Sequence, residues 1–244
     1  VCSSDLQTNM RGPIVGFWPR LPGAVPRLQN PHMHLTEACL AAFEATGDQR
    51  FLDQAAELVE LLRTRLFDGV TLGERFDEDW NRLTCEEGRA VEPGHHFEWA
   101  WILAQYQRIT GVGVLSQAQA LAEFAEQYGV DHSSGAVFDL IRDDGAPLRT
   151  SSRAWTNTER IKAWLGLYEL TGRDPTAEVS AALWLLFDRY FAVETPGAWI
   201  DQFDGEGQPM VKAVPASIVY HLLLAFSEVL RLEPQLKSVA QSRS

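Results

Sequence analysis

The sequence predicts an all-α fold, an (α/α)6 barrel in which helical hairpins form two concentric rings. Helix-like segments end in Thr-Gly turns at Gly47, Gly111 and Gly172, which recur about every sixty residues. Loops that carry Gly, Asp and an aromatic residue repeat at the same period over 135–147 and 197–209. Amphipathic helices also alternate with helices that are apolar on every side. Together these features are typical of a toroid with amphipathic helices outside and apolar helices inside.

Each helix can be placed from its local signals. We expect seven helices, at roughly 31–46, 48–67, 94–110, 115–128, 155–171, 175–192 and 214–232. Asn30-Pro31 and Asp174-Pro175 each offer an N-cap side chain followed by proline at the first helical position. The three turn glycines suit a left-handed C-cap.

The apolar pattern assigns the helices to the two rings. Over 48–67 the apolar residues recur with a period of 3.6 and charged residues lie on the opposite side, so this helix has one face in water. Segments 96–104 and 217–226 are apolar nearly all round, as expected of enclosed helices. The inner helices should begin at one mouth of the barrel, where the loops gather.

A closed ring of six hairpins needs twelve helices, so the seven expected here suggest the C-terminal part of a longer barrel. The first six residues, VCSSDL, resemble the translation of a sequencing-adapter end. We therefore exclude residues 1–6 from the fold prediction as non-native. Residues 7–244 are expected to form a single barrel domain, because one hydrophobic core can still grow at this length.

Composition excludes two classes of partner. Lys and Arg number 21 against 33 Asp and Glu, a formal net charge of −12 without a basic cluster, so nucleic acid is not an expected partner. No apolar run is long enough to span a bilayer, so a membrane is not expected either. The three cysteines have neither metal-type nor disulfide-framework spacing, which favours a reducing, cytoplasmic location. Small neutral substrates remain open, and so does the oligomeric state.

Three histidines are candidates for one site on the inner helices. His34 lies on the small-residue face of its helix, and His221 shares a face with Ser217. His95 and Glu98 stand at i and i+3, so both can reach one ligand. A toroid brings its inner helices together around an axial pocket. Histidine can both take and give a proton near neutral pH, which is what proton abstraction next to a carbonyl requires.

Two further histidines are expected to have structural roles. His32 points about 200° away from His34 along the helix, and His96 is turned by about 100° from His95. We therefore predict that His32 and His96 brace the structure rather than face the pocket.

Four segments stand out as a set: NPHMHLTEA at 30–38, EPGHHFEWAW at 92–101, RAWTNTERIKAW at 153–164 and SIVYHLLLAF at 217–226. In this order they resemble the N-acylglucosamine 2-epimerase superfamily, and within it the aldose–ketose isomerase branch. The resemblance implies an (α/α)6 barrel that interconverts a free monosaccharide aldose and its ketose, of the D-mannose to D-fructose type, through a cis-enediol. It also implies that no metal and no nucleotide cofactor is used.

The resemblance further implies roles for individual residues. His95 and His221 would be the acid–base catalysts on opposite sides of C1 and C2 of the sugar. His34 and Asn30 would bind hydroxyls and help to open the sugar ring. Glu98 would hold a sugar hydroxyl or orient His95.

One matching segment departs from the family pattern. Trp155 and Glu159 would line the sugar pocket, as the corresponding residues of the family do. Between them, Thr156 and Asn157 stand where the family has Pro and Gln. The family also has an arginine in its N-terminal hairpins that contributes to the sugar site, and this chain begins after them.

Other functions stay open at this stage. A sugar 2-epimerase begins with the same proton removal and differs only in where the proton returns. A metal-dependent isomerase would use a His-x-His set, but His32 and His34 diverge on a helix. A glycoside hydrolase or lyase would need a carboxylate pair, for which Asp139 and Asp201 occupy equivalent loop positions. A non-catalytic toroid would leave the convergence of the histidines and Glu98 unexplained.

Overall fold

The structure is a computed structural model that describes residues 6–21, 23–210 and 214–241. All seven predicted long helices are present: α2 (Asn30–Thr46), α3 (Gln49–Leu61), α5 (Pro93–Thr110), α6 (Leu115–Gly129), α7 (Ala154–Thr171), α8 (Thr176–Leu185) and α9 (Val219–Gln241). Single π-helical turns extend α3 over Leu62–Leu66 and α8 over Leu186–Tyr190. Of the N-terminal segment 1–6, all but Leu6 lies outside the described residues.

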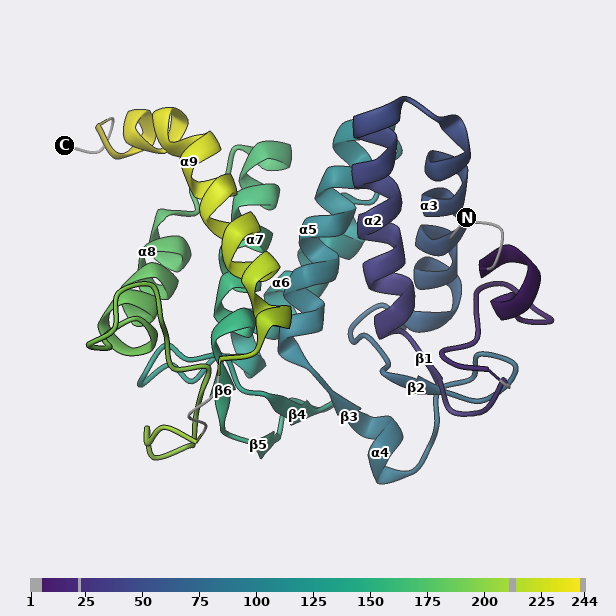
Figure 1. The fold of residues 1–244 in the computed structure, drawn as a ribbon, viewed down its shortest axis with the longest axis horizontal. Coiled ribbons are helices and arrows are strands. Elements are labelled where there is room, and N and C mark those ends of the chain that lie inside the picture. The colour runs from purple at the N-terminus through teal and green to yellow at the C-terminus, as the bar shows by residue number, and fades with distance from the viewer. Residues whose placement is uncertain (1–5, 22, 211–213, 242–244) are drawn as a thin grey trace.

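The helices form inner and outer layers, as predicted. Helices α2, α5, α7 and α9 lie side by side as the inner layer, and α3, α6 and α8 each pack on the inner helix that precedes them (Figure 1). Every residue of the first fourteen in both α5 and α7 is buried, which explains why their sequences are apolar nearly all round. Helix α3 keeps its exposed charged face. No helix in the described ranges has the length and apolarity needed to cross a membrane.

The predicted C-caps are confirmed, and one of the two predicted N-caps is wrong. Gly47, Gly111 and Gly172 have φ of 70°, 73° and 72°, a left-handed conformation that a side chain would disfavour. The Asp174 carboxylate accepts the Thr176 N–H at 2.9 Å, as a capping side chain does. Asn30 instead lies within α2 and makes no cap, because its amide is drawn to a histidine of the next inner helix.

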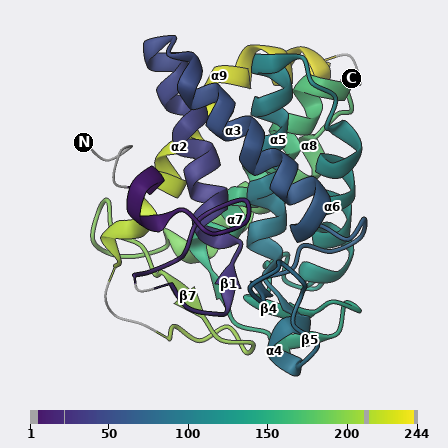
Figure 2. The ribbon, with the colours of Figure 1, turned by 90° about the vertical axis from the view of Figure 1, so that its right-hand side faces the viewer.

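Short strands that the sequence did not reveal fasten the loops at one end of the barrel. They are β1 (Arg27–Leu28) with β2 (Arg75–Phe76), β3 (Ala90–Val91) with β4 (Leu140–Arg142) and β5 (Pro147–Arg149), and β6 (Ser152–Arg153) with β7 (Gln202–Phe203), all antiparallel. Runs of two or three residues are too short to give a strand-like alternation. The strands gather, together with α4 (Glu86–Arg89), below the helices (Figure 2). The inner helices begin at this end, and β1, β3 and β6 stand directly before the N-termini of α2, α5 and α7.

Candidate active site

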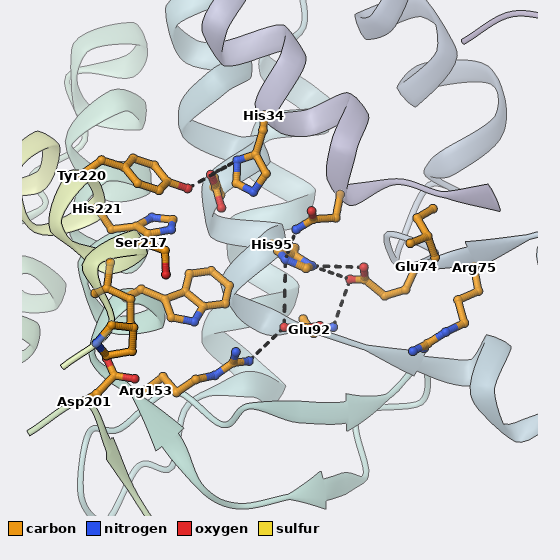
Figure 3. Close-up of a pocket in the computed structure, with 16 residues that line it drawn as sticks. His34, Glu74, Arg75, Glu92, His95, Arg153, Asp201, Ser217, Tyr220 and His221 are labelled. Carbon is orange, nitrogen blue, oxygen red and sulfur yellow. Dashed lines mark hydrogen bonds and ion pairs between the residues drawn. The ribbon is translucent and has the colours of Figure 1, made fainter. Parts of the chain in front are cut away.

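A cavity of about 580 Å³ opens where the inner helices begin (Figure 3). It is lined by Leu28, Asn30, His34, Glu74, Arg75, Glu92, His95, Glu98, Arg153, Trp155, Asp201, Pro215, Ser217, Ile218, Tyr220 and His221. The structure thus brings together six of the seven residues that the sequence analysis selected. The seventh, Glu159, lies directly behind His221.

The helical repeat explains this convergence. In α2, α5 and α7, one side chain stands at the same distance along the chain from the C-cap glycine (34 to 47, 98 to 111 and 159 to 172). These three side chains, His34, Glu98 and Glu159, meet His221 of α9 at the cavity wall. All of them lie in the first two turns of their helices, where the helix dipole is positive.

His95 has a buried carboxylate partner that the sequence analysis did not identify. Its Nδ1 lies 3.0 Å from Glu74 Oε1, and its Nε2 lies 3.0 Å from the amide of Asn30. Burial alone would lower the pKa of His95, but the charges of Glu74 and Glu92 outweigh it and raise the pKa to about 9. His95 is therefore protonated at neutral pH, and its Nε2–H then requires the Asn30 amide to present its oxygen to the ring. The contact that orients its ring comes from Glu74, while Glu98 faces another histidine.

His221 is held in the same way by a second buried carboxylate. Its Nδ1 lies 2.6 Å from Glu159 Oε1, and the Glu159 side chain is completely buried. Burial raises the pKa of Glu159 above its ordinary value, and the nearby Lys162 ammonium opposes that rise. With Nδ1 on the carboxylate, Nε2 of His221 is the nitrogen left for the cavity.

Trp155 packs against both of these histidines. Its ring centroid lies 5.5 Å from that of His95 and 5.2 Å from that of His221. This approach depends on Gly94, because a Cβ at that position would lie 2.6 Å from the Trp155 ring. An indole beside two imidazoles gives the cavity an apolar wall against which a sugar ring can pack.

His34 lies beside two acidic side chains and keeps part of its surface exposed. Its Nδ1 lies 3.3 Å from Glu98 Oε1 and 3.9 Å from Glu37 Oε2, and the Tyr220 hydroxyl lies 3.4 Å away. Burial would lower the pKa of His34, but Glu37 and Glu98 raise it to about 10. The cavity therefore has a second cationic imidazole at neutral pH.

Sequence reasoning missed several cavity residues for physical reasons. Glu74 comes from the loop directly before β2 and stands 21 residues before His95, so no helical spacing connects the two residues. Glu92 does stand three residues before His95, and its Oε2 lies 4.0 Å from His95 Nε2, so an i, i+3 search could have found it. Arg153 links Glu92 to the buried Asp139 at the floor of the cavity.

The prediction that two histidines brace the structure is confirmed. Nδ1 of His32 donates to the Leu28 carbonyl at 2.9 Å, and its Nε2 accepts the Phe17 N–H at 2.9 Å. His96 repeats the arrangement with the Glu92 carbonyl and the Leu72 N–H, both at 3.0 Å. Burial lowers the pKa of each to about 4, so both are neutral.

The carboxylates proposed for a hydrolase have unequal environments. Asp139 is buried and already bonded to Arg153, Ser151 and Gln202, so it is occupied in holding the floor of the cavity. Asp201 lines the cavity, and burial raises its pKa. The site therefore offers one of the two carboxylates, not a matched pair.

Three acidic clusters in the described ranges have ligand atoms close enough for a cation: His34, Glu37 and Glu98; Glu74, Glu92 and His95; Glu98, Glu159 and His221. Each cluster already contains a positive charge or a shared proton. His34 and His95 are protonated at neutral pH, and the Lys162 ammonium lies 2.9 Å from Glu159. The donor chemistry is that of hydrogen-bonded ion pairs, and we assign none of these residues as metal ligands.

The two residues that depart from the family pattern lie outside the cavity lining. The Asn157 side chain donates to the Arg153 carbonyl at 2.8 Å and accepts the Val137 N–H at 3.1 Å. The Thr156 hydroxyl also donates to the Arg153 carbonyl, at 2.8 Å. Both side chains therefore fasten the start of α7 rather than shape the cavity.

The fold and the cavity define an α/α-toroid protein of the sugar-converting class, with histidine–carboxylate pairs at the mouth of its inner helices. The family model of N-acylglucosamine 2-epimerase matches residues 14–225, and the chain belongs to this family of enzymes. A mannose-6-phosphate isomerase of Rhizobium meliloti (strain 1021) is 34% identical over 92% of this chain and 60% of its own length.

Two further comparisons agree with this assignment. A D-mannose isomerase of Pseudomonas cannabina pv. alisalensis is 28% identical over 86% of this chain and 56% of its own length. A crystal structure of a D-mannose isomerase superposes with a TM-score of 0.77 at 22% identity, over 86% of this chain and 58% of that one. The predicted toroid fold is thus confirmed. The chain spans about 60% of the length of the first of these relatives.

Proposed function

We propose that this chain carries the active site of an isomerase that interconverts a free aldose and its ketose, of the D-mannose to D-fructose type, by histidine acid–base chemistry. One observation carries the proposal. His95 and His221 line the same cavity, and each has its Nδ1 on a buried carboxylate. Two imidazoles that face one cavity, of which His95 is protonated at neutral pH, meet the needs of proton transfer between neighbouring carbons.

In the proposed reaction one imidazole is the general base and the other is the general acid. His221, whose Nδ1 proton is directed to Glu159, removes the proton at C2 of the open-chain aldose with its Nε2. His95, protonated at neutral pH, gives a proton to the carbonyl oxygen at C1, which yields a cis-enediol. His221 then returns its proton to C1 while the C2 hydroxyl gives its proton back to His95. The product is the ketose, and both histidines regain their starting states.

Other cavity groups would hold the sugar and stabilise the charge that develops on it. The His34 cation and the positive ends of the inner helices favour a negatively charged enediolate. Glu98 Oε2 is buried without a hydrogen-bond partner among the described residues, so it can accept a sugar hydroxyl. The Asn30 amide contacts His95 and also lines the cavity, so it can bond to a second sugar hydroxyl.

The cavity lining carries charges of both signs. Four carboxylates, those of Glu74, Glu92, Glu98 and Asp201, face the guanidinium groups of Arg75 and Arg153 and the protonated imidazoles of His34 and His95. Arg153 is paired with Glu92 and Asp139, whereas Arg75 makes a long contact, 3.5 Å to the Glu87 carbonyl. Comparison of kcat/KM for D-mannose and for mannose 6-phosphate tests whether the Arg75 guanidinium serves a phosphate group.

Proton NMR of D-mannose in D2O tests the reaction, with the protein treated with a strong chelator. Fructose carrying deuterium at C1 is the expected product. Glucose carrying deuterium at C2 would instead identify a 2-epimerase, and activity that disappears with the chelator would identify a metal enzyme. A His95→Gln/His221→Gln variant is the control and should be inactive. Mannose that keeps its C2 proton in the presence of the native protein would refute the proposal.

A further inference from the structure

Lys162 is a fully buried lysine in a position that the reaction proposed above does not use. It lies in α7, three residues after Glu159, and its side chain has no exposed surface. Lysine is rarely buried completely unless its charge is paired, because removal of an ammonium group from water is costly. An uncharged helix former at this position would avoid that cost. The complete burial of Lys162 therefore indicates that its charge has a role in the protein.

The ammonium group of Lys162 lies one helical turn behind the cavity wall. Its Nζ is 2.9 Å from Glu159 Oε2, 3.7 Å from Glu37 Oε1 and 4.0 Å from the centroid of the Trp101 ring. Lys162, Trp101 and Glu37 each stand ten residues before a C-cap glycine (162 to 172, 101 to 111 and 37 to 47), so they form a second layer beneath the wall. Lys162 reaches the cavity wall through Glu159, and Glu37 reaches it through His34.

The groups around Lys162 are predominantly acidic. Glu37 faces it from α2, Glu98 from α5 and Glu159 from its own helix, while His221 approaches from α9 on the far side of Glu159. Burial lowers the pKa of Lys162, but these three carboxylates together raise it, so the ammonium stays charged. Without that charge, the buried Glu98 and Glu159 would repel each other, and one of them would take up a proton.

The two oxygens of Glu159 connect Lys162 to the catalytic base. Oε2 faces the Lys162 ammonium, and Oε1 lies 2.6 Å from Nδ1 of His221. An ionised Glu159 can only accept a hydrogen bond, so the proton of a neutral His221 must lie on Nδ1. A protonated Glu159 could donate instead, and the His221 proton would then move to Nε2, the nitrogen that faces the cavity.

We propose that Lys162 is a positioning residue of the proposed isomerase, whose buried ammonium keeps Glu159 ionised and thereby fixes the His221 proton on Nδ1. The inference rests on the proposed function for its effect on turnover. The tautomer of His221 is a property of the unliganded protein, so it can be measured whether or not the substrate has been assigned correctly.

Lys162→Met and Lys162→Gln test the role in turnover, because both remove the charge and leave an extended side chain that is only one atom shorter. Each should lower kcat about 10-fold to 10³-fold while KM changes less than about threefold, since a general base is impaired and no sugar contact is lost. The acid limb of the kcat/KM profile should move to higher pH, because Glu159 would keep its proton longer. Lys162→Arg, which retains the charge, should keep the native pH profile.

Two controls separate positioning from a purely structural role. Arg27→Met removes another fully buried cation, one that packs over Trp80 and bonds to backbone carbonyls away from the cavity. It should lower stability without moving the acid limb. In a Glu159→Gln background, Lys162→Met should have almost no further effect on kcat. Independent, multiplicative losses in the double variant, or an unchanged pH profile in folded Lys162→Met or Lys162→Gln, would overturn the proposal.

Nitrogen NMR of the histidine rings in the native protein tests the proposal without a variant. At pH 7 the His221 ring should be protonated at Nδ1 with Nε2 free. A native protein in which the His221 proton lies on Nε2 would contradict the positioning role directly. Absence of sugar turnover together with an Nδ1-protonated His221 would refute the proposed function and leave the role of Lys162 supported.

Discussion

The inner helices have two faces that use the same kind of side chain for opposite purposes. His96 stands fifteen residues before Gly111 and His32 stands fifteen before Gly47 (96 to 111 and 32 to 47), and both hold backbone groups. His34 stands two residues further along α2, and His95 is the residue before His96, yet both line the cavity. The pKa values are about 4 for each bracing histidine, and about 9 and 10 for His95 and His34.

The difference comes from the atoms that each ring meets. On the bracing face Nε2 accepts a backbone N–H, so a second proton would lose a hydrogen bond and place a charge in a dry site. On the cavity face Nδ1 meets a carboxylate, so the second proton is stabilised by a nearby charge. The atoms that the fold brings to each ring therefore decide whether a histidine is a neutral bracing residue or an acid.

The largest expected effect follows from removal of a cavity histidine. His95→Gln and His221→Gln should each lower kcat/KM for D-mannose about 10²-fold to 10⁴-fold, the usual loss when a general acid or base is removed. Steady-state assays of fructose formation measure this. His32→Gln, on the bracing face, is the matched control and should change kcat/KM less than about threefold. Equal losses on the two faces would refute the division of roles.

A smaller effect is expected when the cavity carboxylate is neutralised and the histidine is kept. Glu74→Gln removes the charge that raises the pKa of His95, so His95 should lose its proton at a lower pH than in the native protein. The alkaline limb of the kcat/KM profile should therefore move to lower pH, and kcat/KM at pH 8 should fall roughly 10-fold. Profiles recorded from pH 5 to 10 check this. An alkaline limb that stays in place would show that Glu74 does not set the acidity of His95.

The sequence predicted the fold and selected most of the named residues that meet at the cavity, because both depend on periodic features. Thr-Gly turns mark the helix ends, and apolar periodicity separates inner from outer helices. Once the inner helices are placed, side chains within the first two turns of each helix can converge, which is why His34, His95 and His221 could be selected. The cavity roles of these residues rest on the family resemblance and on the arrangement described above, and they stay predictions until variants are assayed.

The partners of these residues could not be predicted, since they arise from tertiary contacts. Glu74 reaches His95 from a loop whose position depends on the pairing of β1 with β2. In the sequence Lys162 is simply one polar residue of a predicted helix. Its burial arises because α7 packs against α5, α6, α8 and α9. The Asn30 cap failed for a related reason, because the side chain bonds to His95 rather than to its own helix.

The smallest effect on turnover, and the clearest on stability, is expected at the bracing face. Asn157 occupies the place in α7 that His96 occupies in α5, fifteen residues before its C-cap glycine (157 to 172), and makes the same two backbone contacts. His96→Asn should therefore fold and keep kcat/KM within about threefold.

Neutral His96 has a pKa near 4 against an ordinary 6.5, so the unfolded chain binds more protons between these values. The native protein should lose stability as pH falls from 6.5 to 4, and His96 should account for about 3 kcal/mol of the loss. Urea unfolding at pH 7.5 and 4.5 should show a visibly flatter pH dependence in His96→Asn, and an unchanged dependence would mean that His96 is not buried as a neutral ring.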